Sequence, residues 1–383
     1  MILTMDSKKI KETIEMSGPS ITELEVEYVL DMMNNCWYGP KKYDYVEIFE
    51  KEFANWHGRE YGLMTSNCTA AIHLLLKCLD IGVGDKVVNQ ECTWVASAAA
   101  VEYVGAKNIF VDIDKDNWCM EVDSLEKSIT YDTKAVIATG IYGNMPEIDE
   151  IENICNEKHI CLIEDSAEAL GSKLKGRRAG NFGLASVFSF HRTKTMTTGE
   201  GGMLITNDEE LFKRCKIIRD QGRDEERSYW INELGLKYMP FSLQAALGYA
   251  QFKRINDLVD KKRHIYMLYK ELFSDLEDVY LNTDDDITFN GCWATTMVLG
   301  ESHRITSEQI MELIGKKGLP VRPFFYPLSS MPLFIKDNPN KNEVNLNAYD
   351  IPHRGLTMPS ALNLTNNQVE LYAKSVIEII QSK

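Results

Sequence analysis

The segment Phe188 to Met203 reads FSFHRTKTMTTGEGGM and carries one lysine, Lys194, in a short polar turn. The glycines that follow it, Gly199, Gly201 and Gly202, allow the backbone to turn tightly before the next apolar run. An amine held in such a turn and partly removed from water can act as a nucleophile and a base, because desolvation favours its neutral form. The alternative is an ordinary exposed lysine, since lysines are rarely buried.

A second candidate is Asp165, which ends the apolar run of HICLIEDSAEALGS. In open α/β sheets, ligand-contacting groups gather at the carboxyl ends of the strands. A carboxylate buried there is strongly disfavoured unless a cation or hydrogen-bond donors meet it, so we expect a cationic partner. The alternative is that Asp165 only caps a following helix.

A third candidate is the start of SNCTAAIHLLLKCL, where Ser66 and its small polar neighbours open a strongly apolar helix. The free N–H groups of the residues up to Ala70 and the positive end of the helix dipole would bind a phosphate. The alternative is plain capping of the helix by Ser66 or Thr69.

One ligand accounts for all three features, and that ligand is pyridoxal 5′-phosphate (PLP). Its phosphate suits the helix start, its protonated ring nitrogen suits Asp165, and its aldehyde suits Lys194 as an imine. One further predicted strand separates Asp165 from Lys194 along the chain, so both can lie at the same edge of a sheet.

The elements that must position these residues alternate between short β-rich runs and helical stretches up to about residue 206. The runs are mostly continuous in apolar residues, as is typical of a largely parallel sheet with helices on both faces. This pattern predicts the α/β class. The expected strands span residues 86–89, 108–111, 135–141, 160–164, 186–190 and 203–206.

Helical periodicity predicts the remaining elements. Apolar residues at helical spacing predict an N-terminal helix capped by Thr22, with one buried face. Asn207 and Glu210 have the spacing of a capping box that opens another helix. The apolar face of the first helix comprises Val26, Val29, Leu30 and Met33. Further helices are expected at residues 242–259, 307–315 and 367–381, and a strand in WATTMVLG from residue 293.

Length and composition indicate a protein with a substantial core. The chain has 383 residues, of which 44% are hydrophobic, enough for a large domain and an appended smaller one. We expect residues 1–261 to form the N-terminal helix with the large α/β domain, and residues 262–383 to form a smaller C-terminal domain.

The net charge and the cysteine pattern limit which partners and which cellular compartment we expect. The net charge of −15 disfavours nucleic acid as a partner. The nine cysteines are scattered and never spaced as C-x-x-C, which argues against a disulfide framework and a metal cluster. We therefore expect reduced thiols in the cytoplasm. The first 16 residues lack the apolar run of a signal peptide, and no later stretch suits a membrane span.

Several motifs, occurring in order, resemble those of the DegT/StrS family of sugar aminotransferases over nearly the full chain. The resemblance implies PLP fold type I, the aspartate aminotransferase fold, with a large, mostly parallel α/β domain and a smaller C-terminal α/β domain. The matching motifs are SNCTAAIHLLL, CTWVASAAAV, IYGNMPEIDEI, EDSAEALGS, FGLASVFSFHRTKTMTTGEGGML and SLQAALGYAQ.

The resemblance also implies roles for individual residues. Lys194 would carry PLP as an imine, and Asp165 would contact the pyridine nitrogen. Trp94 would stack on the cofactor ring, although a tryptophan in the core is the alternative. Glu168, where the family often has glutamine, would lie near the phenolic oxygen of the cofactor. The phosphate would be held by Ser66, Thr69, the backbone at Ala70, and Ser189.

Two features refine the expected reaction. Glu168, together with VRPFFYPLSSMPLF from Val321, is most similar to the family branch that makes perosamine from GDP-4-keto-6-deoxymannose. The sugar 3-dehydratases of the family carry histidine where this chain has Lys194, so the chain resembles a transaminase. The alternatives are a PLP-dependent sugar lyase or dehydratase and a non-enzymatic regulator.

The chain departs from the family pattern in two places. The segment GLKYMPFSLQAA, from residue 235, lacks polar groups that usually reach the phosphate of the neighbouring subunit's cofactor, but Lys237 remains and can supply the charge. Gly140 stands where the family usually has histidine, which affects the substrate pocket.

The partners implied by the resemblance are L-glutamate as amino donor, a nucleotide-linked keto-sugar, and a second copy of the chain. The amino sugar would serve polysaccharide biosynthesis. Because a nucleotide sugar carries a diphosphate, positive side chains must meet it locally, although each candidate could instead be a solvated surface charge. The candidates for substrate binding are Arg219, Arg223, Lys237, Arg322 and, near them, Tyr326.

Overall fold

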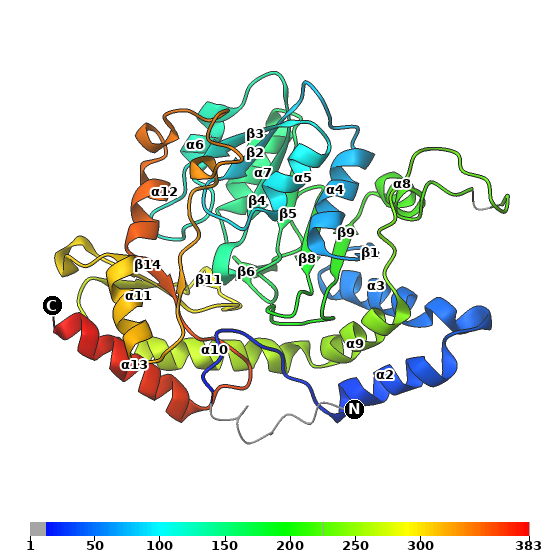
Figure 1. The fold of residues 1–383 in the computed structure, drawn as a ribbon. Helices are drawn as coiled ribbons and strands as arrows, with labels where there is room; N and C mark the ends of the chain where they lie inside the picture. The colour runs from blue at the N-terminus through cyan, green and yellow to red at the C-terminus, as the bar shows by residue number, and fades with distance from the viewer. Residues whose placement is uncertain (1–12, 225, 383) are drawn as a thin grey trace.

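The computed structural model describes residues 13–224 and 226–382 of the chain (Figure 1). Most of the N-terminal stretch in which no signal peptide is expected, residues 1–12, lies outside the described residues. No helix in the described ranges is both long and apolar enough to cross a membrane. All nine cysteines of the sequence lie in these ranges and are unpaired.

A large, mostly parallel sheet forms the centre of the molecule (Figure 1). In the described part of the chain its strands lie in the order β1 (Tyr61–Thr65), β9 (Gly202–Thr206), β8 (Ala185–Ser189), β5 (Cys161–Asp165), β4 (Thr133–Thr139), β2 (Lys86–Gln90) and β3 (Lys107–Val111). β8, β5, β4, β2 and β3 pair in parallel, whereas β9 pairs antiparallel with β8 and β1. The predicted α/β class is confirmed, and the predicted strands lie within two residues of the observed bounds. β1 was not predicted.

Helices cover both faces of this sheet, which explains why its strands are apolar on both sides. Val187 and Phe188 are neighbours on β8 but belong to cores on opposite faces. One face packs against α4 (Cys68–Cys78), α5 (Ala96–Tyr103) and α8 (Glu209–Arg219). The other face packs against α3 (Asp44–Trp56), α6 (Val122–Ser128), α7 (Ile148–Glu157) and α9 (Ser242–Lys253).

A second, antiparallel sheet lies in the C-terminal part. Its order is β10 (Val279–Leu281), β12 (Thr296–Leu299), β14 (Gly355–Thr357) and β13 (Arg322–Pro323). A core on it also contains side chains of α11 (Ser307–Lys316) and α13 (Asn366–Gln381). Other short elements are β6 (Lys173–Leu174), β7 (Arg177–Arg178), β11 (Thr288–Phe289) and α12 (Leu346–Asp350).

The helix α10 (Ile255–Leu272) joins the two cores. Its first turns, with Ile255 and Leu258, pack into the core of the large sheet, and its later turns, with Ile265 and Tyr269, pack into the core of the small sheet. Figure 1 shows α10 running along the base of the molecule between α9 and α13. The predicted boundary between residues 261 and 262 falls within α10, and the division into two domains stays a prediction.

The N-terminal helix α2 (Glu23–Asn35) forms as expected, but its predicted buried face is wrong. Val26, Leu30 and Met33 are exposed, whereas Glu25 and Met32 are buried. Glu25 turns inward because Arg254 and Gln251 hydrogen bond to its carboxylate at 2.5 and 2.6 Å. Periodicity identifies an apolar face but not the surface against which a helix packs.

Two other local predictions need correction. Asp208 caps α8 by accepting the Leu211 N–H at 2.9 Å, while the Asn207 side chain accepts the backbone N–H of Glu60. The capping box predicted at Asn207 is therefore wrong, and the helix cap is the next residue, Asp208. The single helix predicted over residues 242–259 is two helices, because Arg254 leaves helical geometry between α9 and α10.

Candidate functional site

The candidate site lies at the carboxyl edge of the large sheet, where β4, β5 and β8 end together. Thr139 pairs in register with Asp165, and Asp165 pairs with Val187. Side chains of paired residues in parallel strands point to the same face, and so does Ser189, two residues after Val187. This is the face that α4 and α5 cover. The strand ends therefore place Asp165 and Ser189 on the same face at this edge of the sheet.

The amine of Lys194 lies in the same place, held by Glu168. Lys194 follows β8 in a turn closed by its own N–H, which donates to the His191 carbonyl at 2.9 Å. Its Nζ donates to Oε1 of Glu168 at 3.0 Å, and the two side chains are 13% and 4% exposed. Lys194 is thus a largely buried, paired amine and not an ordinary exposed lysine.

The electrostatics of the site follow from burial. Burial raises the pKa of Glu168, and the charge of Lys194 opposes this rise. Burial also raises the pKa of Asp165, against hydrogen bonds from the Ser97 hydroxyl at 2.7 Å and the Ala167 N–H at 3.1 Å. These donors hold Asp165 at the sheet edge. In the described part of the chain no helix begins directly after Asp165, and the next one is α8, so Asp165 is not a helix cap.

The carboxylate of Asp165 can still pair with a cationic group. It is 4% exposed, and no ion pair joins it to another of the described residues. The Oγ1 of Thr139 is also buried and has no hydrogen-bond partner among residues 13–224 and 226–382. A buried acid next to a buried hydroxyl without a partner indicates a site for a polar, cationic group.

The start of α4 lies directly against β9, close to Ser189. A Cβ on Gly202 would lie 2.5 Å from the carbonyl carbon of Asn67, so only glycine allows this approach. Asn67, which the sequence reasoning missed although asparagine is a preferred cap, accepts the Ala70 N–H at 2.8 Å. The Ala70 amide is therefore engaged, and neither Ser66 nor Thr69 is the cap.

Two aromatic candidates, Trp94 and Tyr326, do not lie in the core. Trp94 is 62% exposed, so the alternative of a core tryptophan is excluded, and its ring lies 6.2 Å from that of Phe325. Tyr326 is 42% exposed. Arg322 is exposed and lines a small cavity of about 50 Å³ together with Tyr142 and Trp293.

Arg219 does not have the exposed position expected of a substrate-binding residue. Its guanidinium is buried and donates to Oε1 of Glu50 at 2.6 Å and to the Met64 carbonyl at 2.5 Å. Burial raises the pKa of Glu50, and Arg219 opposes this rise. The substrate-binding prediction for Arg219 is wrong, because this arginine neutralises a buried acid.

The other basic candidates lie on the surface. Lys237 pairs with Asp220 at 2.6 Å with its side chain 59% exposed, and Arg223 approaches the same acid at 3.7 Å. Gly140, which stands where the family usually has histidine, packs tightly. A Cβ there would lie 2.7 Å from the Cβ of Ala169, so a side chain does not fit without a shift.

Besides Asn67, the sequence reasoning missed three further residues of the site. Ser97 orients Asp165, the backbone N–H of Tyr142 donates to Oε2 of Glu168 at 2.9 Å, and the ring of Trp293 lies 3.9 Å from Nζ of Lys194. Tyr142 belongs to the quoted motif IYGNMPEIDEI and could have been considered. Nothing in the local sequence connects Trp293 to Lys194.

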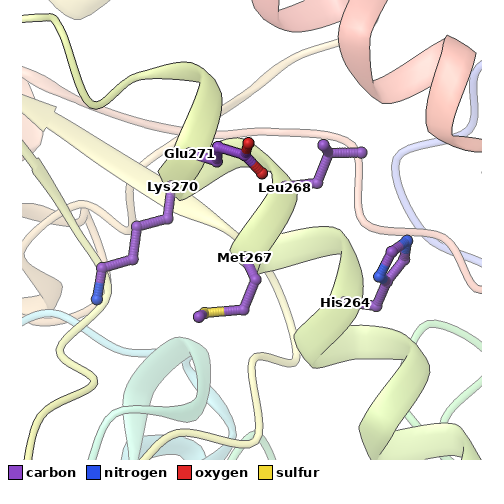
Figure 2. A pocket seen from close by; sticks show the side chains of 5 residues that line it. All are labelled: His264, Met267, Leu268, Lys270 and Glu271. Atoms are coloured by element: carbon purple, nitrogen blue, oxygen red, sulfur yellow. The ribbon is translucent and has the colours of Figure 1, made fainter.

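A separate surface pocket lies on α10, away from these residues. Figure 2 shows its lining side chains, all of which come from this one helix. The pocket has a volume of about 360 Å³ and contains none of the predicted site residues. Its lining residues are His264, Met267, Leu268, Lys270 and Glu271.

Comparison with known proteins decides the family. Residues 19–380 match the family model described as the DegT/DnrJ/EryC1/StrS aminotransferase family. The chain belongs to this family. The predicted family and enzyme class, a PLP-dependent aminotransferase, are thereby confirmed.

Individual relatives cover almost the whole chain. A GDP-perosamine synthase from Escherichia coli O157:H7 is 36% identical over 370 residues, which is 97% of this chain and 99% of that one. A GDP-perosamine synthase from Vibrio cholerae is 32% identical over 358 residues, or 93% and 96% of the two chains. The solved structure of Helicobacter pylori PseC, an aminotransferase involved in the biosynthesis of pseudoaminic acid, superposes with a TM-score of 0.88. It is 24% identical and covers 97% of this chain and 100% of that one, so it supports the fold.

The residues of the site fit PLP. The amine of Lys194 suits its aldehyde, and the buried carboxylate of Asp165 suits its ring nitrogen. The Ser189 hydroxyl and the N–H groups of Cys68 and Thr69, the first two residues of α4, suit a phosphate.

Proposed function

We propose that this protein transfers an amino group from L-glutamate to the ketone of a nucleotide-linked 4-keto-6-deoxy sugar, with a GDP-linked sugar favoured. The observation that carries the proposal is the largely buried contact of Lys194 with Glu168, at the sheet edge where Asp165 ends β5. The two relatives named GDP-perosamine synthase support the choice of sugar and nucleotide.

The residues have distinct roles in this proposal. PLP, when bound, supplies an electron-withdrawing ring that stabilises negative charge at the carbon next to the reacting nitrogen. Asp165 keeps a negative charge at the ring nitrogen. Lys194, once its amine is free, moves a proton at Nζ, first from the donor and later to the sugar product. Glu168 holds that amine through Oε1. Ser189, Thr69 and the start of α4 bind the phosphate, and Trp94 covers the ring.

The substrate side is open to the solvent. Arg322 is exposed and lines the small cavity together with Tyr142 and Trp293, and Tyr326 is also exposed. We assign the diphosphate of the nucleotide sugar to Arg322, because Arg219 is occupied by Glu50. An arginine suits this task, since its planar fork can bind phosphate oxygens in pairs.

A homodimer with shared sites is part of the proposal. The apolar side chains of α2 (Val26, Leu30 and Met33) are exposed, and so are those of a segment from residue 229 to 241 (Tyr229, Trp230, Leu234 and Phe241). This segment follows α8 and projects from the body of the molecule (Figure 1). Exposed apolar surface of this kind supports association with a second copy, in which Lys237 would reach the partner's site. The unpaired cysteines support a location in the reducing cytoplasm.

The proposal is tested by turnover with defined substrates. The purified protein, PLP and L-glutamate are incubated with GDP-4-keto-6-deoxymannose or, in parallel, with a UDP-linked 4-keto-6-deoxy sugar. Formation of 2-oxoglutarate together with an amino sugar of the expected mass is predicted for the GDP-linked substrate. Turnover only with the UDP-linked sugar would move the proposal to another nucleotide, and no amino sugar from either would reject it.

A further inference from the structure

The indole of Trp293 is the second group that contacts the amine of Lys194. Nζ lies 3.9 Å from the ring centroid of Trp293 and 3.0 Å from Oε1 of Glu168. A lysine ammonium near the face of an aromatic ring is attracted by the electrons of the ring, and the attraction is larger when water is excluded. Trp293 is 8% exposed, so this contact is shielded.

Contacts on several sides fix the position of the indole. Its Nε1–H donates to the Thr193 carbonyl at 2.8 Å, directly before Lys194 in the chain. The Trp293 carbonyl accepts a hydrogen bond from the buried Lys262 at 2.9 Å. The ring of Tyr142 lies parallel to it at an angle of 5°, with the centroids 6.2 Å apart. The indole is therefore held in a fixed orientation next to the lysine turn.

The same tyrosine supports the other contact of the amine. The backbone N–H of Tyr142 donates to Oε2 of Glu168 at 2.9 Å. Tyr142 holds a φ of +55°, a conformation that is unfavourable for a tyrosine. Tyr142 thus packs on Trp293 with its ring and orients Glu168 with its backbone, which links both contacts of Lys194.

We propose that Trp293 is a positioning residue that stabilises the free Lys194 ammonium beside Glu168 whenever this amine is not bonded to PLP. The inference rests on the proposed function of Lys194. An aminotransferase frees its lysine in each half of the reaction and needs it again at the same place. A lysine side chain has a long flexible stem, so its free amine could take many positions. Two contacts that hold the amine keep it at the position where it is needed next.

The electrostatic surroundings of Lys194 must be part of any test. The charged or titratable groups that act on it are Glu168, Asp165, His191, Cys68 and the buried Lys262. Variants at Trp293 leave all of these groups in place. A changed pH dependence of the reaction of the Lys194 amine with PLP then reports the loss of the indole ring.

The experiment measures how fast the full-length protein, freed of cofactor, binds PLP covalently at different pH values. The neutral amine adds to the aldehyde carbon and water leaves, so the rate rises as the ammonium loses its proton. In Trp293→Leu the ammonium is less stable, and the midpoint of the pH–rate profile is expected to fall by about one pH unit. Trp293→Phe keeps a smaller ring, and its midpoint is expected to fall by about half as much.

Controls separate this inference from the proposed function. Trp56→Leu removes a tryptophan that packs on Arg178 at 4.3 Å, outside the site, and is expected to leave the profile unchanged. Borohydride reduction followed by peptide mass analysis locates the bound cofactor. If the wild-type protein is not labelled at Lys194, the proposed function is wrong. If it is labelled but the Trp293→Leu profile coincides with that of the wild type, only the role of Trp293 is wrong. If Trp293→Leu fails to fold, the Trp293→Phe profile decides in the same way.

Discussion

Nζ of Lys194 and Oε1 of Glu168 form a largely buried contact of 3.0 Å between two turns that follow neighbouring strands, β8 and β5. The backbone N–H of Tyr142 holds the other carboxylate oxygen. The amine is therefore placed by a carboxylate that is itself fixed. This arrangement explains how a flexible lysine is presented at the sheet edge next to Asp165.

Glu168 is expected to act mainly as a hydrogen-bond acceptor. Glu168→Gln keeps an oxygen that can accept from Lys194 or Tyr142, so its kcat should fall by less than about tenfold. Glu168→Leu removes both acceptors, and its kcat should fall by about 100-fold or more. Steady-state kinetics of both variants check this prediction, and a Glu168→Leu enzyme with wild-type kcat would contradict it.

Asp165 is expected to supply charge rather than to bind the cofactor covalently. Asp165→Asn should lower kcat by about 10²–10³-fold, because the negative charge at the ring nitrogen is lost. Covalent PLP should still form at Lys194 and be visible in the absorbance spectrum. Ser97→Ala is the matched control, because it removes one hydrogen bond to Asp165 and leaves the charge. An equal loss in both variants would show that position, not charge, is what matters.

Arg219 and Arg322 are expected to respond in opposite ways. Arg219→Met leaves the Glu50 carboxylate buried without its partner, which should lower the free energy of unfolding by about 3–5 kcal/mol. Arg322→Gln should raise KM for the nucleotide sugar and leave thermal stability unchanged. Thermal melts and kinetics of the two variants test this. A stable Arg219→Met protein with a raised KM would restore the original prediction of substrate binding.

The buried Lys262 is expected to make stability depend on pH. Burial lowers the pKa of its amine to about 7, from 10.5 in the unfolded chain. Between these values the unfolded state binds more protons, so stability should rise with pH, by at most about 1.4 kcal/mol per pH unit. The gain in stability is complete above pH 10.5, the pKa in the unfolded chain, and absent below about pH 7.

Denaturant unfolding at several pH values between 7.5 and 9.5 measures this slope. In Lys262→Met the titrating amine is gone, although the carbonyls of Trp293 and Ser360 lose their donor. The free energy of unfolding of the wild type should therefore rise with pH relative to that of the variant. Parallel curves would mean that Lys262 does not titrate in this range.

The parts of the site that could be predicted depend on local rules. Asp165 could be found because the end of a parallel strand is visible in the sequence as the end of an apolar run, whereas Ser189 was identified only by the resemblance to the family. Lys194 could be found because its turn lies between two such runs. The strands were likewise predicted closely, since both faces of the sheet are covered and continuous apolar runs result.

The parts that could not be predicted depend on distant contacts. Arg219 suggests a surface charge in the sequence, but its partner Glu50 lies 169 residues before it. The inward turn of α2 depends on Arg254 and Gln251 in the same way. Trp293 reaches Lys194 from the C-terminal part of the chain. Sequence patterns predict the apolar faces and the ends of helices and strands. The residues against which these elements pack are known only from the folded structure.

The most direct measurement of the central claim is the absorbance spectrum of the purified protein with PLP, before and after L-glutamate, beside Lys194→Ala. The wild type should show the visible band of lysine-bound cofactor, and glutamate should shift it to the band of the amine form. Lys194→Ala should lack the first band. The assignment of Lys194 as the cofactor-binding lysine would be contradicted if the wild type lacked that band after addition of PLP. It would also be contradicted if Lys194→Ala showed the same visible band as the wild type.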